Sequence, residues 1–142
     1  RLAAALAGKV TPLKSALLLA SDGRNDGNLE MVEVFSLKIN PRLVVLSACE
    51  SGLGSLEGGD EVQGLNRAFL YAGAGGVLAS LWSVPDESTF RLMERFYQEL
   101  HSPRPADEAL REAQLHLMES FPEPVHWGAF YLTGIEAVQP AD

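Results

Sequence analysis

A short apolar run over residues 43–48 constrains the fold of this chain more than any other stretch. It reads Leu-Val-Val-Leu-Ser-Ala, and it is too short to form an independent helix. An apolar run of this kind with β-branched side chains is typical of a strand buried on both faces of a sheet. Glycines follow within a few residues, so Cys49 is expected at the carboxyl end of a central strand. Open α/β sheets gather ligands and reacting groups at that edge.

Apolar runs alternate with segments of helical periodicity along the rest of the chain. The predicted strands cover residues 15–20, 43–48, 77–82 and 127–132. The predicted helices cover residues 29–37, 60–72, 87–101 and 106–119. Two Asp-Gly pairs between residues 21 and 28 predict a hairpin or a tight loop. Strands that alternate with helices indicate a parallel sheet flanked by helices, and the 142 residues suffice for one domain with one core.

Each of the longer predicted helices carries an apolar stripe that should face the core. The expected inner residues are Val62, Leu65, Phe69 and Ala72 in one helix, Met93, Phe96, Tyr97 and Leu100 in the next, and Ala106, Ala109, Leu110, Ala113 and Leu117 in the last. Asp60 is expected to be a helix N-cap with Gln63 as its capping-box partner. Asn40 and Pro41 should end the short helix that precedes the central strand.

The excess of acidic residues limits the kinds of binding partner that we expect, and the single cysteine indicates the redox conditions of the compartment. The formal net charge is −8 and no basic run offsets it, so neither nucleic acid nor an anionic membrane surface is an expected partner. No apolar run reaches the ~18 residues that a membrane span requires. A lone cysteine excludes an internal disulfide and suits a reducing cytoplasm. The sequence starts without Met inside an apparent structural element, so we expect a piece of a longer protein.

Cys49 is open to two interpretations. It is either a small buried apolar side chain, as free cysteines often are, or a nucleophile at a strand tip. A reactive thiolate needs access and a lowered pKa, which a histidine usually supplies. His101 is expected to cap a helix end, His116 to be exposed, and His126 to be structural. The three show no metal-ligand spacing with one another or with Cys49, so no metal site is predicted.

The glycine-rich segment and Asp86 also allow more than one interpretation. Gly52 and Gly54 resemble part of a dinucleotide-binding fingerprint, but Glu57 stands where that pattern has its third glycine. Acidic residues at the start of the next helix would repel a pyrophosphate, so nucleotide binding is the weakest alternative. Asp86 follows a proline and precedes a helix, so it is either an N-cap or a group that faces a peptide bound over Cys49.

Several segments, in order, resemble a CHAT domain, the caspase-like domain associated with tetratricopeptide repeats. The resemblance rests on residues 15–20, 43–52, 58–73, 79–86 and 126–130, and with them it covers nearly the whole chain. The pattern Leu-Trp-x-Val-x-Asp over residues 81–86 also resembles the corresponding part of separase, a related protease. The resemblance implies a single CHAT domain over residues 1–142. It would be the C-terminal part of a caspase-like three-layer α/β/α sandwich with a mostly parallel central sheet.

The family resemblance also implies a peptidase with a Cys-His dyad that needs no cofactor. Cys49 matches the nucleophile, whose own backbone N–H would form part of the oxyanion hole. Asp86 matches the acid that receives a basic residue at the cleavage site in separase-like members. Residues 81–83, which include Trp82 and Ser83, match the segment whose backbone pairs with an extended substrate.

One departure from the family pattern concerns the general base. The family carries a histidine, usually followed by glycine or alanine, at the tip of the strand before residue 15, where this chain has Ala3, Ala4, Ala5 and Leu6. The chain is therefore a His-to-Ala variant, a truncated or altered chain, or a natural pseudoenzyme. In each case the thiol stays mostly protonated near its free pKa of ~8.5, and a general-base factor of ~10²–10⁴ is lost.

The leading hypothesis is a cytoplasmic cysteine endopeptidase that cleaves an extended protein segment, with Cys49 as nucleophile and its base missing. The main alternative is a non-catalytic module that keeps the fold and binds a peptide or a partner protein. Tetratricopeptide repeats of the same parent chain, or a separate sensor protein, are the expected regulators by analogy with the family.

Overall fold

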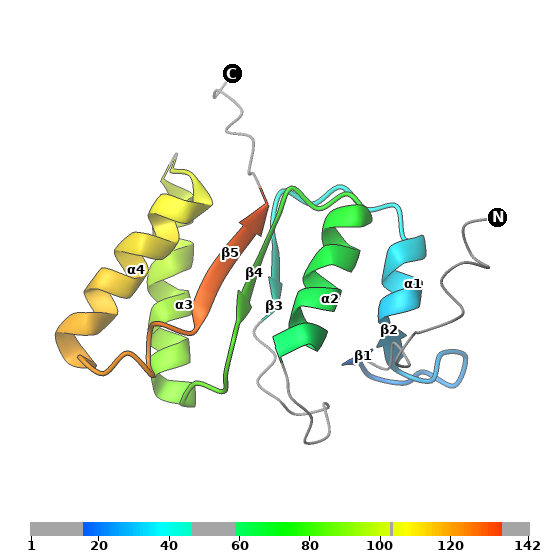
Figure 1. Cartoon of the computed structure of the whole chain (residues 1–142), viewed down its shortest axis with the longest axis horizontal. Coiled ribbons are helices and arrows are strands. Elements are labelled where there is room, and N and C mark those ends of the chain that lie inside the picture. The colour runs from blue at the N-terminus through cyan, green and yellow to red at the C-terminus, as the bar shows by residue number, and fades with distance from the viewer. Residues whose placement is uncertain (1–15, 47–58, 103, 135–142) are drawn as a thin grey trace.

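The computed structural model describes residues 16–46, 59–102 and 104–134, and for residues 59–62 it describes the backbone alone. The elements are β1 (Ala16–Leu18), β2 (Asn28–Glu30), α1 (Met31–Ser36), β3 (Val44–Leu46), α2 (Gly59–Tyr71), β4 (Gly76–Ser80), α3 (Asp86–His101), α4 (Ala106–Ser120) and β5 (Phe130–Gly134). Together they form a mixed α/β structure (Figure 1). No helix in the described ranges has the length and apolarity that crossing a bilayer would require.

Strands β3, β4 and β5 form one sheet in which β4 lies between the other two. β3 runs parallel to β4, and β5 runs antiparallel to it. Helices α1 and α2 lie on one face of this sheet, and α3 and α4 lie on the other (Figure 1). At one edge β3 and β4 end and β5 begins, with Leu46 opposite Ala79 and Ser80 opposite Phe130. We call this edge the carboxyl edge.

The number of helices between successive strands explains the strand directions. One helix, α2, returns the chain from the end of β3 to the start of β4, which makes this pair parallel. Two helices, α3 and α4, lie between β4 and β5, so the chain arrives back at the carboxyl edge and β5 enters antiparallel. The expected α/β class is confirmed. The predicted mostly parallel sheet, however, extends only to β3 and β4 in the described part, where the other two strand pairings are antiparallel.

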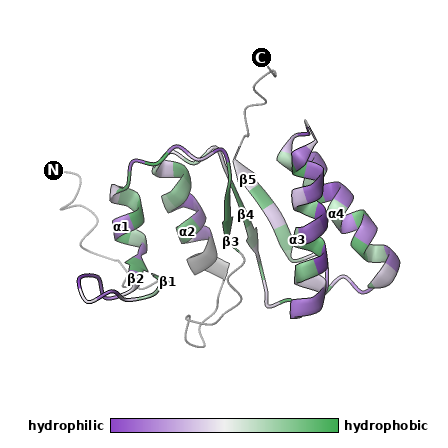
Figure 2. Cartoon of the chain, turned by 180° about the vertical axis from the view of Figure 1, so that it is seen from behind, coloured by the Kyte–Doolittle hydropathy of each residue, from purple (hydrophilic) through white to green (hydrophobic). Residues whose placement is uncertain are grey.

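Strand β4 divides the core into two apolar clusters. All five of its residues are buried, and successive side chains point to opposite faces of the sheet. Val77 packs with buried residues of α1 and α2, whereas Leu78 packs with those of α3, α4 and β5. Figure 2 shows the hydrophobic residues of β3 and β4 lying between the two pairs of helices. The fully buried central strand is therefore β4, because the described residues of β3 are only half-buried.

The first two strands form a hairpin, which is one of the two arrangements that the Asp-Gly pairs predict, although the sequence pattern predicts a helix and not a strand from residue 29. β1 pairs antiparallel with β2, and Leu17 lies opposite Leu29. In the connecting loop, the Asp22 carboxylate accepts hydrogen bonds from the backbone N–H groups of Asn25 and Arg24 at 2.8 and 2.9 Å. These bonds hold the pKa of the Asp22 carboxyl below its ordinary value.

The short helix α1 begins later and ends earlier than the predicted span of 29–37. Glu30 belongs to β2 and forms a capping box with Glu33, so the helix starts after Glu30. The helix ends at Ser36, because Leu37 adopts an extended backbone conformation. Pro41 therefore lies beyond the helix end and is not what terminates it.

Other boundaries also differ from the prediction, since β1 ends at Leu18 and β4 at Ser80, before the predicted strand ends at 20 and 82. Helix α2 begins at Gly59, so Asp60 lies in its first turn and is not its N-cap. Strand β5 begins at Phe130 and not at residue 127, because the N–H groups of Trp127 and Gly128 both donate to the carbonyl of Pro124, at 3.3 and 2.7 Å, in the preceding turn.

The buried face of α4 is as predicted, whereas that of α3 is rotated. All five expected α4 residues are buried, and so are Leu65 and Phe69 of α2 and Ala72 directly after it, while the side chain of Val62 lies outside the described part. On α3 the fully buried side chains are Ser88, Leu92 and Phe96, and Met93 and Leu100 are partly buried against them. Tyr97 is 47% exposed, so its expected place on the inner face is wrong.

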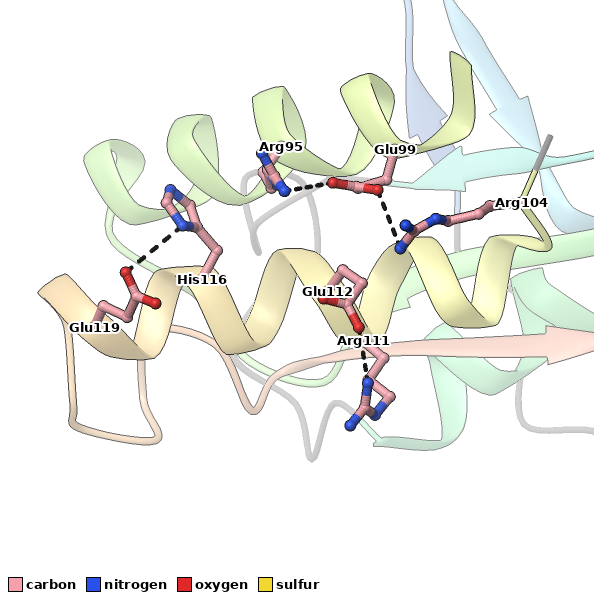
Figure 3. A network of polar contacts seen from close by, with 7 residues as sticks. All are labelled: Arg95, Glu99, Arg104, Arg111, Glu112, His116 and Glu119. Carbon is pink, nitrogen blue, oxygen red and sulfur yellow. Dashed lines mark hydrogen bonds and ion pairs between the residues drawn. The ribbon is translucent and has the colours of Figure 1, made fainter. Parts of the chain in front are cut away.

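Glu99 is a buried acid of α3 that the sequence pattern does not predict. It is 8% exposed, and its carboxylate pairs with the guanidinium groups of Arg95 and Arg104 (Figure 3). Two cations offset the cost of removing one carboxylate from water. The pairing thereby ties the last turns of α3 to the segment that leads into α4.

Candidate functional site

The carboxyl edge is where the predicted site residues should meet. Strand β3 ends there at Leu46, and Cys49 follows in the sequence but lies outside the described residues, as do Ala3 to Leu6 and the glycine-rich segment 51–58. The position of Cys49 therefore stays a prediction. Strand β4 ends beside β3, and the residues after it are described, so that Trp82, Ser83 and Asp86 can be placed.

The side chain of Trp82 is hydrogen-bonded to, and packs against, the turn that precedes β5. Its indole N–H donates to the carbonyl of Val125 at 3.1 Å, and its ring lies against Gly128. The backbone N–H of the preceding Leu81 donates to the carbonyl of Ala129 at 3.0 Å, which continues the β4–β5 pairing by one step. The indole is thus held on the β5 side of β4 and not on the β3 side. It still exposes 40% of its surface.

The pairing of the backbone with β5 stops after Leu81 and does not continue to Trp82 and Ser83. Within the described residues, no backbone hydrogen bond joins either residue to another part of the main chain. Ser83 is exposed. Unpaired backbone groups next to a strand end can accept an added strand, and a peptide would align along them in an extended conformation.

Asp86 is the first residue of α3 and is exposed. The N-cap position belongs to Pro85, so the N-cap interpretation of Asp86 is wrong by one residue. The carboxylate lies in the first helical turn, where the helix dipole favours negative charge. Among the described residues it makes no hydrogen bond or ion pair, whereas the adjacent Glu87 pairs with Arg91 at 2.7 Å. Asp86 therefore offers a negative charge near the carboxyl edge that has no partner among the described residues.

All three histidines of the sequence are described. His101 ends α3 and is exposed, and its Nδ1 lies 2.9 Å from the carbonyl of Tyr97, which fits the predicted role at a helix end. His116 is exposed on α4, 3.8 Å from Glu119 (Figure 3). His126, in the turn before β5, contacts Ser88 and the ring of Phe121, which fits the predicted structural role. None of these contacts is with β3, the strand that leads to Cys49.

A hydrogen bond joins α2 to β5, and the sequence pattern does not predict it. The side-chain amide of buried Asn66 donates to the hydroxyl of Tyr131 at 2.6 Å. Burial raises the pKa of the Tyr131 hydroxyl, and the bond from Asn66 opposes that rise. The hydroxyl therefore stays protonated at neutral pH. An isolated Asn and a Tyr 65 positions apart carry no sequence signal for such a pairing.

The described residues bear on the metal site but not on the glycine segment of the nucleotide alternative. No group of three or more His, Cys, Asp or Glu side chains in these ranges is arranged to hold a metal ion. Gly52, Gly54 and Glu57 lie outside the description. The first turn of α2 carries Asp60 and Glu61, and negative charge at a helix N-terminus opposes an anionic ligand.

Comparison with known proteins places these observations in a family. Residues 2–135 match the CHAT domain family. The chain is 34% identical over 125 residues to tetratricopeptide repeat protein 28 of Mus musculus. It is 36% identical over 125 residues to the protein of the same name in Homo sapiens. Each alignment covers 87% of this chain but only 5% of the relative, so the chain spans a small part of the length of these relatives.

Proposed function

Because this chain belongs to the CHAT domain family, we propose that it forms the catalytic half of a caspase-like cysteine endopeptidase with Cys49 as nucleophile. The observation that carries the proposal is the parallel pairing of β3 with β4, which ends both strands at one edge. Cys49 follows the first of these strands in the sequence, and Trp82, Ser83 and Asp86 follow the second. Reacting and recognising groups gather at such an edge in α/β sheets.

The proposal includes the caspase-like three-layer α/β/α sandwich for residues 1–142. Helices on both faces of the β3–β4–β5 sheet support it. The names of the curated relatives support a parent chain with tetratricopeptide repeats, which would act as a regulator in place of, or together with, a separate sensor protein.

In the proposed mechanism, an extended protein segment adds to the backbone of Trp82 and Ser83 as a further strand. The Asp86 carboxylate receives an Arg or Lys side chain of that segment. The Cys49 sulfur, after losing its proton to water, then attacks the carbonyl carbon of the peptide bond that follows this residue, and the backbone N–H of Cys49 stabilises the oxyanion. The peptide C–N bond breaks, the leaving amine takes up a proton from water, and a water molecule hydrolyses the thioester to release the carboxylic acid and restore the thiol. No cofactor takes part. Without a histidine base the attack is slow, because little of the thiol is ionised at neutral pH.

The reactivity of Cys49 tests the proposal directly. Iodoacetamide should modify Cys49 in the folded chain, because a nucleophile must be accessible to its substrate. Mass spectrometry reports the reaction without ambiguity, since the sequence contains one cysteine. A sample unfolded in denaturant gives the full extent of labelling. Labelling that occurs only after unfolding would instead place the sulfur in the core and contradict the proposal.

Replacing Asp86 by Asn should weaken binding of Arg- and Lys-containing peptides by about two- to fivefold, the value of an exposed ion pair. Peptides with Gln at the same position should bind equally to both proteins. Glu87→Gln is the matched control, because that neighbouring acid already pairs with Arg91. The difference should shrink at high salt. Fluorescence anisotropy measures it, and equal losses in the two variants would remove Asp86 from the recognition site.

The second candidate is a non-catalytic module that binds a peptide or a partner protein through the same surface. The contacts of the three histidines favour it, because His101, His116 and His126 each contact residues away from β3. The two candidates share peptide binding at Trp82, Ser83 and Asp86 and differ only in the chemistry of Cys49. A histidine introduced as a general base would distinguish the two candidates, because only the endopeptidase would then cleave a peptide.

A further inference from the structure

His126 and Ser88 form a polar contact that joins the turn before β5 to the first turn of α3. The Nδ1 atom of His126 lies 3.0 Å from the Oγ atom of Ser88. Ser88 is fully buried and lies two residues after Asp86 in the sequence. Its Oγ is also 2.9 Å from the carbonyl oxygen of Pro85, the N-cap residue of α3.

These two contacts determine which nitrogen of His126 carries a proton. The carbonyl of Pro85 can only accept, so the single hydroxyl proton of Ser88 is donated to it. The Ser88 oxygen then acts as acceptor toward His126, and Nδ1 must be the protonated nitrogen. This arrangement satisfies a buried hydroxyl completely, as buried polar groups require. The neutral imidazole therefore keeps its lone pair on Nε2.

The imidazole ring is held from a second direction. Its centroid lies 4.8 Å from that of the Phe121 ring, and the guanidinium of Arg91 lies 5.6 Å from the same phenyl centroid. The contacts of Phe121 with Arg91 and with His126 connect α3 to the segment after α4. The contact with Phe121 thus holds the His126 ring in position, and the contact with Ser88 determines its tautomer.

We propose that His126 is a positioning residue: through Ser88 it fixes the first turn of α3, and with it the direction of the Asp86 carboxylate. Three bonds converge on this turn, since the Pro85 carbonyl also accepts from the backbone N–H of Thr89 at 3.0 Å. The turn before β5 also holds Trp82 through Val125. One turn therefore orients both the indole and the acid, and the recognition role of Asp86 in this inference rests on the proposed function.

The tautomer of His126 is the first measurement, and it does not depend on function. A long-range ¹⁵N–¹H correlation spectrum at a pH where imidazole is neutral should show His126 protonated on Nδ1. In Ser88→Ala the tautomer ratio should move toward that of the exposed His116, which serves as an internal reference. Protonation of His126 on Nε2 in the wild-type chain would overturn the proposal.

Three substitutions at His126 form the second measurement. His126→Asn places an amide N–H close to the position of Nδ1, His126→Gln places it further out, and His126→Ala removes it. In the Ala and Gln variants, hydrogen exchange at the amides of Thr89 and Phe90 should become about tenfold faster, because a buried bond is lost. The Asn variant should restore wild-type exchange. Amides from Leu92 onward should not change in any variant.

Peptide binding is the third measurement. The preference for Arg- or Lys-containing peptides over Gln-containing ones should fall in the Ala and Gln variants and return in the Asn variant. An Asn variant that behaves like the Ala variant would overturn the proposal, because then the imidazole acts only by its size. If neither the wild-type chain nor any variant binds a basic peptide, the proposed function fails. The tautomer and hydrogen-exchange data then decide the role of His126 by themselves.

Discussion

A histidine placed at one of residues 3–6 is expected to raise the rate of peptide cleavage by about 10²–10⁴, the usual contribution of a positioned general base. The resemblance to the family places its histidine in this segment, where the chain has three alanines and Leu6. A neighbouring imidazole would favour the thiolate of Cys49, which near its free pKa of ~8.5 is mostly protonated at neutral pH. Under the proposed function, one side chain is enough for this gain because Cys49 already supplies the nucleophile.

The experiment uses four single variants, Ala3→His, Ala4→His, Ala5→His and Leu6→His, with a library of extended peptides that carry Arg or Lys. We expect cleavage to rise only in the variant that brings the imidazole to Cys49, so the other variants serve as its controls. Adding Cys49→Ser to the active variant should abolish the gain.

The outcome also separates the two candidate functions. If none of the four variants cleaves any peptide while iodoacetamide still labels Cys49 in the folded chain, the endopeptidase proposal is wrong. The non-catalytic module would then account for the backbone of Trp82 and Ser83, which no backbone hydrogen bond joins to the rest of the described chain, and for the Asp86 carboxylate, which has no partner among the described residues. Binding of basic peptides without cleavage would confirm that interpretation.

Replacing Phe96 by Ala is expected to lower the free energy of unfolding by about 3–5 kcal/mol. Phe96 is fully buried in the cluster formed by α3, α4, β4 and β5, and it is the largest fully buried side chain among the described residues. Truncation removes its apolar contacts and leaves a cavity that the two packed helices cannot fill. Because small domains are stable by only about 5–15 kcal/mol, this loss is a large share of the total.

Phe90→Ala is the matched control, because it removes the same side chain from the same helix. Phe90 is 66% exposed, so we expect a change within about 0.5 kcal/mol. Urea denaturation followed by circular dichroism compares the two midpoints. Equal losses in the two variants would mean that the buried face of α3 is not the one described here, and in particular that Tyr97 and not Phe96 faces the core.

Periodicity in the sequence was sufficient to predict most of the helices and the strands. The α4 stripe of Ala109, Leu110, Ala113 and Leu117 recurs at helical spacing, and all four side chains are buried. The hairpin of β1 and β2 follows from its Asp-Gly pairs, and the parallel pairing of β3 with β4 follows from the single helix between them. Such patterns are predictable because they arise from backbone geometry within one element or between neighbouring elements.

The order of strands and loops in the sequence marked Cys49 and Asp86 as candidates, but only the resemblance to the family assigned their roles and added Trp82 and Ser83. That resemblance also marked the missing base. It could not indicate that the indole of Trp82 is bound to the carbonyl of Val125, 43 positions away. The role of Cys49 remains a prediction from the sequence, to be tested by labelling.

Three features were decided by the tertiary structure alone: the antiparallel entry of β5, the burial of Glu99 between two arginines, and the contact of His126 with Ser88. In the last case the partners are 38 positions apart, and neither residue is unusual in its local sequence. A buried polar group must find a partner wherever the packed helices and turns bring one within reach. Local sequence therefore determined which segments are helices and strands, and packing determined which polar side chains meet between them.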